Sequence, residues 1–100
     1  MASDYYPLYF WPEADSAMEY LASDGEATGL CDAVGRVLRN LSADPYSRRL
    51  GTALFKSPEL GGICATPVRI DDWYVFWQRS PDPGALEIVL IHQLPVGQPS

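Results

Sequence analysis

Residues 63–93 read ICATPVRIDDWYVFWQRSPDPGALEIVLIHQ, and this stretch decides the fold class. Three of its segments are rich in β-branched and aromatic residues, as strands are: 63–70, 73–78 and 86–93. The turn Asp71-Asp72 separates the first two segments, and the proline-containing loop 80–84 separates the last two. Short connections of this kind join antiparallel neighbours, so the stretch predicts a three-stranded meander.

The second and third strands of this meander carry apolar side chains on both faces. Alternation in the second strand places Trp73, Val75 and Trp77 on one face and Tyr74, Phe76 and Gln78 on the other. In the third strand, the unbroken apolar run 88–91 is typical of a central strand that is covered on both faces. One helical layer cannot cover so many aromatic side chains. We therefore expect an apolar groove that accepts a helix or strand of a partner protein, with Trp73 and Trp77 as candidate binding residues. A well-filled core is the alternative.

The N-terminal half predicts one strand and a pair of helices. Residues 5–11 are aromatic and favour a strand, and Pro12 is typical of the first position of a helix, which runs to about Ser23. The second helix is predicted over residues 26–41, where apolar residues recur at helical spacing: Leu30, Val34, Val37, Leu38 and Leu41. Asp44-Pro45 ends it, because the residue before a proline avoids the helical conformation.

The resulting order β-α-α-β-β-β predicts an α+β fold, in which the helical hairpin packs on one face of a mostly antiparallel four-stranded sheet. Residues 45–61 are irregular in pattern, and within them Ala53-Leu54-Phe55 form a short extended piece that we expect to dock on the core. The 100 residues make a single domain, 1–100, with its core at about residues 5–94.

Composition argues against several classes of function. The net charge is −6, which disfavours nucleic acid as a partner of the chain on its own, because phosphate-binding surfaces usually carry an excess of Lys and Arg. No apolar run approaches the roughly 18 residues of a membrane helix, and the N-terminus lacks the basic cluster of a signal peptide, so we expect a cytoplasmic protein. Cys31 and Cys64 lie far apart and His92 is the single histidine, so we expect no metal site and no cofactor.

Three motifs resemble the RelE/ParE superfamily of bacterial toxins. Residues 10–14, Phe-Trp-Pro-Glu-Ala, are similar to the strand-to-helix junction of those toxins. Leu41 through Pro45, with Leu54 following, is similar to their exit from the helical hairpin. Residues 68–77 resemble their hairpin pattern x-Arg-x-x-x-Tyr-Arg-val-x-Tyr. The resemblance spans roughly residues 5 to 94 and implies a β-α-α-β-β-β toxin fold, with a cognate antitoxin as partner and gyrase or the ribosome as candidate targets.

The chain departs from the superfamily where the RNA-cleaving members carry cations. Such cations stabilise the negative charge that develops on the scissile phosphate. Here residues 63–68 contain no Lys or Arg, Tyr74 stands in place of the usual arginine, and His92-Gln93-Leu94 stand in place of the usual basic residues. Arg69 alone keeps a matching position. If the chain is a nuclease, the candidate catalytic residues are Arg69, Tyr74 and His92, with Arg69 gripping a phosphate and His92 as general base. Alternatively, Arg69 pairs with a neighbouring aspartate and His92 is a hydrogen-bonded residue at a strand end.

The other candidate binding residues are basic. Arg48, Arg49 and Lys56 form a cluster near the aromatic residues Tyr46 and Phe55, an arrangement that permits stacking on nucleic acid; a solvated loop is the alternative. Arg79 follows the second strand of the meander and is a further candidate.

Three functions are compatible with these observations. The first is a toxin that acts mainly by protein binding, to an antitoxin and to a cellular target, as ParE-type members act on gyrase. The second is a ribosome-dependent mRNA endonuclease of the RelE type with a rearranged site. The third is a non-toxic interaction module, such as a homodimer. The acidity and the missing cations favour the first and third over the second.

Overall fold

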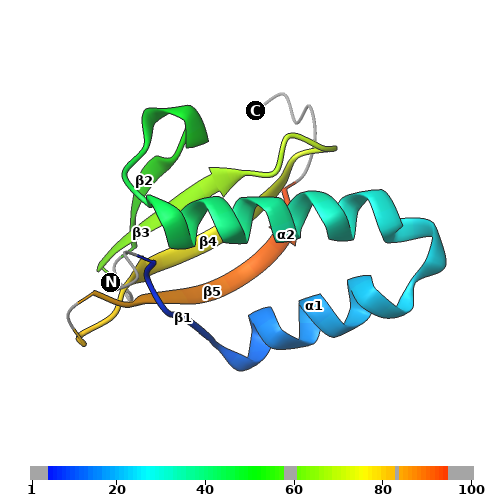
Figure 1. Cartoon of the computed structure of the whole chain (residues 1–100), viewed down its shortest axis with the longest axis horizontal. Helices are drawn as coiled ribbons and strands as arrows, with labels where there is room; N and C mark the ends of the chain where they lie inside the picture. Colours follow the sequence, from blue (N-terminus) through cyan, green and yellow to red (C-terminus); the bar gives the residue numbers. More distant parts are fainter. Residues whose placement is uncertain (1–4, 58–60, 83, 95–100) are drawn as a thin grey trace.

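The computed structural model describes residues 5–57, 61–82 and 84–94, and it contains two helices packed on one face of a five-stranded sheet (Figure 1). The helices are α1, Pro12–Ser23, and α2, Thr28–Ala43, with the short 3-10 turns η1, Gly25–Ala27, and η2, Arg48–Leu50. The strands are β1, Leu8–Phe10; β2, Ala53–Ser57; β3, Gly61–Pro67; β4, Trp73–Arg79; and β5, Leu86–Gln93. The strands lie in the order β1-β5-β4-β3-β2. All neighbouring pairs are antiparallel except β1 and β5, which are parallel.

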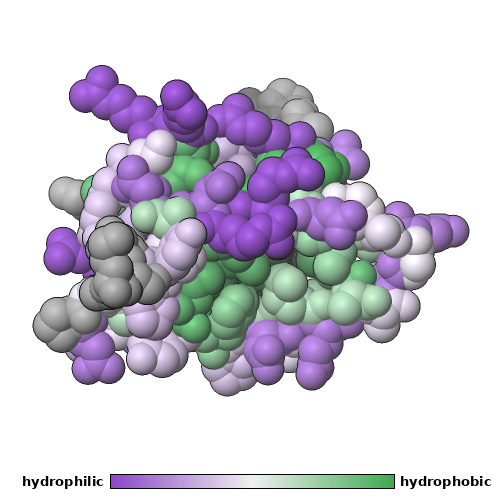
Figure 2. All heavy atoms as spheres, viewed as in Figure 1, coloured by the Kyte–Doolittle hydropathy of each residue, from purple (hydrophilic) through white to green (hydrophobic). Residues whose placement is uncertain are grey.

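The helical hairpin forms where the sequence predicts it. Pro12 occupies the first turn of α1, where its missing N–H costs no hydrogen bond, and Glu13 and Asp15 lie at the positive end of the helix dipole. Asp24 then connects the two helices, since its carboxylate accepts a hydrogen bond from the backbone N–H of Glu26 at 3.0 Å. Figure 2 shows hydrophilic side chains gathered over α2 and hydrophobic ones between α2 and α1, as an amphipathic hairpin requires.

The expected four-stranded sheet is corrected to five strands. Residues 53–57, expected to be a short extended piece docked on the core, instead form β2 and pair antiparallel with β3, from Ala53 opposite Ala65 to Ser57 opposite Gly61. Leu54 is 65% exposed, so the prediction that it docks on the core is wrong. The segment is short and lies among prolines and glycines, and its strand conformation depends on the partner strand rather than on a pattern of its own.

Two further strand boundaries differ from the prediction. The first strand is predicted over residues 5–11, but β1 covers only Leu8–Phe10. The reason is that Tyr6 forms hydrogen bonds with Ser42 at the end of α2. The Tyr6 N–H donates to the Ser42 carbonyl, and the Tyr6 carbonyl accepts from the Ser42 hydroxyl, each at 2.7 Å. The strand predicted over residues 63–70 covers Gly61–Pro67, because the chain turns at Arg69, Asp71 and Asp72, all with positive φ.

A bulge in the central strands explains the unbroken apolar run of β5. Phe76 lies opposite Leu90 and Trp77 lies opposite Ile88, so Val89 is an extra residue without a cross-strand partner. The bulge places both Ile88 and Ile91 in the core beneath the helices, although they are three residues apart. β5 lies between β1 and β4, which confirms its central position.

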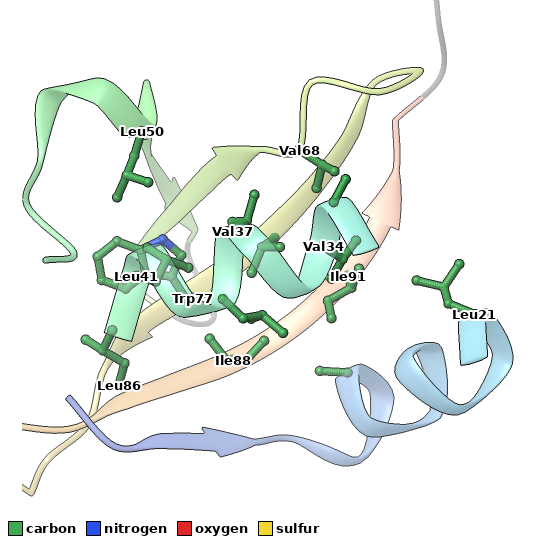
Figure 3. Close-up of a cluster of buried hydrophobic side chains, with 14 residues drawn as sticks. Leu21, Val34, Val37, Leu41, Leu50, Val68, Trp77, Leu86, Ile88 and Ile91 are labelled. Carbon is green, nitrogen blue, oxygen red and sulfur yellow. The ribbon is translucent and has the colours of Figure 1, made fainter. Parts of the chain in front are cut away.

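The core lies between the helical hairpin and the sheet (Figure 3). From α2 it contains Val34, Val37, Leu38 and Leu41, four of the five residues of the predicted stripe, and the fifth, Leu30, packs against it half-buried. Trp77 from β4 is 2% exposed and lies among Leu41, Leu50 and Leu86 in Figure 3. Within the described residues, neither helix has the length and apolar character needed to cross a membrane.

Candidate functional site

The face of the sheet opposite the helices brings together two of the three candidate catalytic residues. Tyr74 of β4 lies directly opposite His92 of β5, and the alternation along the strands places both side chains on this face. The Tyr74 ring also lies beside Phe76, with ring centroids 6.3 Å apart and planes inclined by 44°. His92 is exposed and Tyr74 is half-buried, so an incoming molecule can reach both.

This helix-free face carries no cation among the described side chains. Strand register assigns to it Tyr9, Ala53, Phe55, Ile63, Ala65, Pro67, Tyr74, Phe76, Gln78, Glu87, Leu90 and His92. Glu87, the one acidic group among the described residues of this face, accepts hydrogen bonds from Gln78 Nε2 at 2.8 Å and from Trp11 Nε1 at 3.2 Å. A developing negative charge on a bound phosphate would therefore meet a carboxylate and aromatic rings instead of guanidinium or ammonium groups.

Arg69 lies apart from Tyr74 and His92. Its guanidinium donates from Nη2 to the carbonyl of Arg49 at 3.2 Å, and it lines a pocket together with Ala33 and Val37 of α2, on the helical side of the sheet. Within the described residues, Arg69 forms no ion pair with Asp71 or Asp72, the alternative that the sequence left open. The structure thus brings Tyr74 and His92 together, but it does not add Arg69 to them.

A larger, mostly apolar pocket lies at the open end of the helical layer, between the segment that follows α2 and the strands β2 and β3. It has a volume of about 440 Å³, within the range of small-ligand or side-chain pockets. The residues that line it are Pro45, Tyr46, Ser47, Arg48, Gly51, Thr52, Leu54, Cys64 and Trp77. We call it the β2 pocket. Burial raises the pKa of the Cys64 thiol above the ordinary value of 9.0.

Hydrogen bonds to Thr66 fix two residues that line the β2 pocket, Thr52 and Trp77. Trp77 Nε1 donates to the Thr66 hydroxyl at 2.9 Å, and the hydroxyls of Thr66 and Thr52 lie 2.6 Å apart. Thr66 is completely buried, so this network satisfies polar groups that water cannot reach. Trp77 is consequently a core residue whose side chain a ligand can contact only from inside the β2 pocket. Trp73 is half-buried against the core.

Three apolar residues of this region are exposed; the sequence suggested two of them, Tyr46 and Phe55, only for stacking on nucleic acid, and it placed the third, Leu54, in the core. Leu54 of β2 is 65% exposed and Phe55 is 47% exposed, while Tyr46 at the rim of the β2 pocket is 58% exposed. Leu54 and Phe55 point to opposite faces of an edge strand. The signal available in the sequence was the pair of adjacent bulky apolar residues in an otherwise polar, proline- and glycine-rich segment.

The basic candidate residues are spread over different places. Arg48 and Arg49 are both exposed on η2, but Arg48 lines the β2 pocket and Arg49 lines the pocket of Arg69. Arg79 is exposed at the end of β4. The side chain of Lys56 falls outside the part of the chain that the structure describes.

Comparisons with known proteins support the fold. No protein-family model and no curated protein matches the chain. Among solved structures, a YoeB/ParE toxin from Agrobacterium tumefaciens superposes with a TM-score of 0.73 at 11% sequence identity, covering 89% of this chain and 99% of the toxin. The chain is therefore similar in fold to this YoeB/ParE toxin, in agreement with the toxin fold that the sequence motifs implied.

Proposed function

We propose that this chain is the toxin-like component of a bacterial type II toxin–antitoxin module, and that it acts mainly by binding proteins: a cognate antitoxin and a cellular target. The fold likeness to a protein described as a YoeB/ParE toxin supports the first part. The observation that carries the second part is the helix-free sheet face, where aromatic side chains and one carboxylate stand without a described cation. Aromatic, cation-poor surfaces suit protein partners better than RNA.

The edge strand β2 is the surface we assign to the antitoxin. β2 ends the sheet, so one row of its backbone N–H and C=O groups has no strand beside it among the described residues. Leu54 and Phe55 are exposed there, and Leu54 also lines the β2 pocket. An extended antitoxin segment would pair with β2 through main-chain hydrogen bonds and insert an apolar side chain into the pocket.

Ribosome-dependent mRNA cleavage is the second candidate, and one observation favours it. Tyr74 and His92 are cross-strand partners on one face, and a tyrosine–histidine pair can supply general acid and base. No described cation lies on their face of the sheet to hold a phosphate, which weighs against it. A ParE-type action on gyrase remains the form of protein binding that the family resemblance implies.

The test is to express the chain with and without the product of the neighbouring reading frame. We expect growth arrest by the chain alone, relief by the second protein, and a complex that isothermal titration calorimetry measures directly. Leu54→Glu should weaken the complex by at least about tenfold, because it places a charge in the apolar pocket. Tyr20→Glu is the matched control, since Tyr20 is 64% exposed on α1, away from β2.

Three outcomes discriminate the candidates. Arrest relieved by a partner whose binding depends on Leu54 supports the proposal. A stable homodimer without growth arrest indicates a non-toxic interaction module instead. Arrest accompanied by cleaved mRNA on ribosomes indicates the nuclease.

A further inference from the structure

Three of the seven Lys and Arg residues of the chain line one small pocket on the helical side of the molecule. Arg36 comes from α2, Arg49 from η2 and Arg69 from the loop between β3 and β4. The pocket has a volume of about 250 Å³. Asn40 adds an amide to its lining, and the apolar wall includes Val37, Leu50 and Val68, all labelled in Figure 3. We call it the arginine pocket.

No carboxylate neutralises the arginine pocket. Its lining contains no Asp or Glu among the described residues, and none of the three arginines takes part in an ion pair within the described chain. Asp71 and Asp72 follow Arg69 in the same loop, but both are exposed and neither lines the pocket. In a chain with a net charge of −6, three exposed arginines around one concavity, without an ion-pair partner among the described residues, create a local positive potential.

The backbone is shaped to place Arg69 at this pocket. Arg69 itself adopts a φ of 70°, a left-handed conformation that non-glycine residues rarely take. Its guanidinium lies over Gly51, which has a φ of 68°, and a Cβ atom at position 51 would come within 3.0 Å of Arg69 Nη2. One hydrogen bond, from Nη2 to the Arg49 carbonyl, holds the side chain and leaves the other guanidinium donors available. Strained residues of this kind are characteristic of ligand clamps.

We infer that the arginine pocket binds the phosphate group of a small molecule, as free phosphate or as a phosphomonoester. A carboxylate carries a single charge and would leave two of the three guanidinium charges uncompensated, whereas a phosphate dianion compensates two. Planar guanidinium forks match phosphate oxygens in pairs, and Asn40 supplies a neutral donor beside them. The small volume suits a phosphate with a short attached group. The site is separate from the surface assigned to the antitoxin, because its lining shares no residue with the β2 pocket.

Titration of the protein with inorganic phosphate, followed by calorimetry and by phosphorus NMR at constant ionic strength, tests this site. We expect saturable binding of phosphate, with acetate at least about tenfold weaker. A parallel titration with glycerol 3-phosphate, a phosphomonoester with a short attached group, distinguishes the source: tighter binding than phosphate identifies a phosphomonoester as the ligand, and weaker binding identifies free phosphate.

Variants locate the site. Arg36→Gln and Arg69→Gln should each weaken phosphate binding by about tenfold or more, because each removes a charge-assisted pair of hydrogen bonds. The Arg36 side chain makes no hydrogen bond within the described residues, so we expect its substitution to leave the fold intact, and circular dichroism checks this for both variants. Arg39→Gln is the matched control: it removes the same charge from the same helix but does not line the pocket. Equal weakening by Arg39→Gln, equal binding of acetate, or no saturable phosphate binding by the wild-type protein would each overturn the inference.

Discussion

At the scale of single residues, substitution of Leu38 tests how much the apolar stripe of α2 contributes to the free energy of unfolding. Leu38 is 7% exposed within the core, so Leu38→Ala should lower the free energy of unfolding by about 2–5 kcal/mol through lost burial and the cavity left behind. Leu54→Ala is the matched control, because the same substitution at a 65% exposed site should cost about 1 kcal/mol or less. Urea denaturation of both variants checks this, and a loss well under 1 kcal/mol for Leu38→Ala would contradict the stripe.

Thr66 tests the buried hydrogen-bond network beneath the β2 pocket. Thr66→Val keeps the side-chain shape but removes the acceptor of Trp77 Nε1, and it leaves that donor unsatisfied where water cannot reach it. We expect a loss of about 1–3 kcal/mol in the free energy of unfolding. Thr52→Val is the control, since Thr52 is half-exposed and the Trp77–Thr66 bond survives its substitution. Equal losses in the two variants would mean that the indole contributes little.

Cys64 reports on access to the β2 pocket. Because burial raises its pKa, a smaller fraction of Cys64 is thiolate at any alkaline pH than for an exposed thiol. In a Cys31→Ser background, the rate of alkylation should therefore reach half its maximum above pH 9.0, and the same measurement in denaturant should give a lower midpoint. Coinciding midpoints would show that the folded protein does not shield the thiol.

At the scale of elements, two glycines have opposite roles. Gly35 lies inside α2, where an added Cβ would meet only the end of the Arg39 side chain at 3.5 Å, so Gly35→Ala should raise the free energy of unfolding by about 0.5–1 kcal/mol. Gly51 ends η2 with a φ of 68°, so Gly51→Ala should lower it by about 1–2 kcal/mol. Thermal melts of the two variants should shift in opposite directions. A shared direction would contradict the conformation assigned to one of these two glycines.

The elements with their own periodic pattern were predictable, and those that depend on a distant partner were not. The stripe from Leu30 to Leu41 and the strand 86–93 carry their signals locally, and both appear in the structure. β2 is a strand only because β3 lies beside it, and β1 begins only at Leu8 because Ser42 binds Tyr6. The arginine pocket joins Arg36, Arg49 and Arg69 from three elements, a juxtaposition that only the tertiary fold creates.

At the scale of the whole molecule, the net charge does not show how the charged side chains are distributed over the surface. The net charge of −6 predicts weak attraction to nucleic acid. The structure adds that three of the cations line the arginine pocket on the helical side, while the described helix-free face has none. Sequence reasoning grouped Arg69 with Tyr74 and His92 as one candidate nuclease site. The fold separates them because the chain reverses at positive φ after Pro67 and directs Arg69 toward η2.

This distribution predicts that the isolated protein does not cleave mRNA on ribosomes at a robust rate. Removing one preorganised donor from a working site typically costs about 10²–10³-fold in rate, and the face that holds Tyr74 and His92 has no described cation to act as one. Primer extension on programmed ribosomes should therefore show no site-specific stops with the wild-type protein. His92→Ala and Tyr74→Phe serve as the diagnostic variants, since both residues act directly in any nuclease built on this face. Stops that appear with the wild-type protein and vanish in both variants would show that this face is catalytic without the cations. Stops that survive both variants but vanish in Arg69→Gln would instead place the chemistry at the arginine pocket.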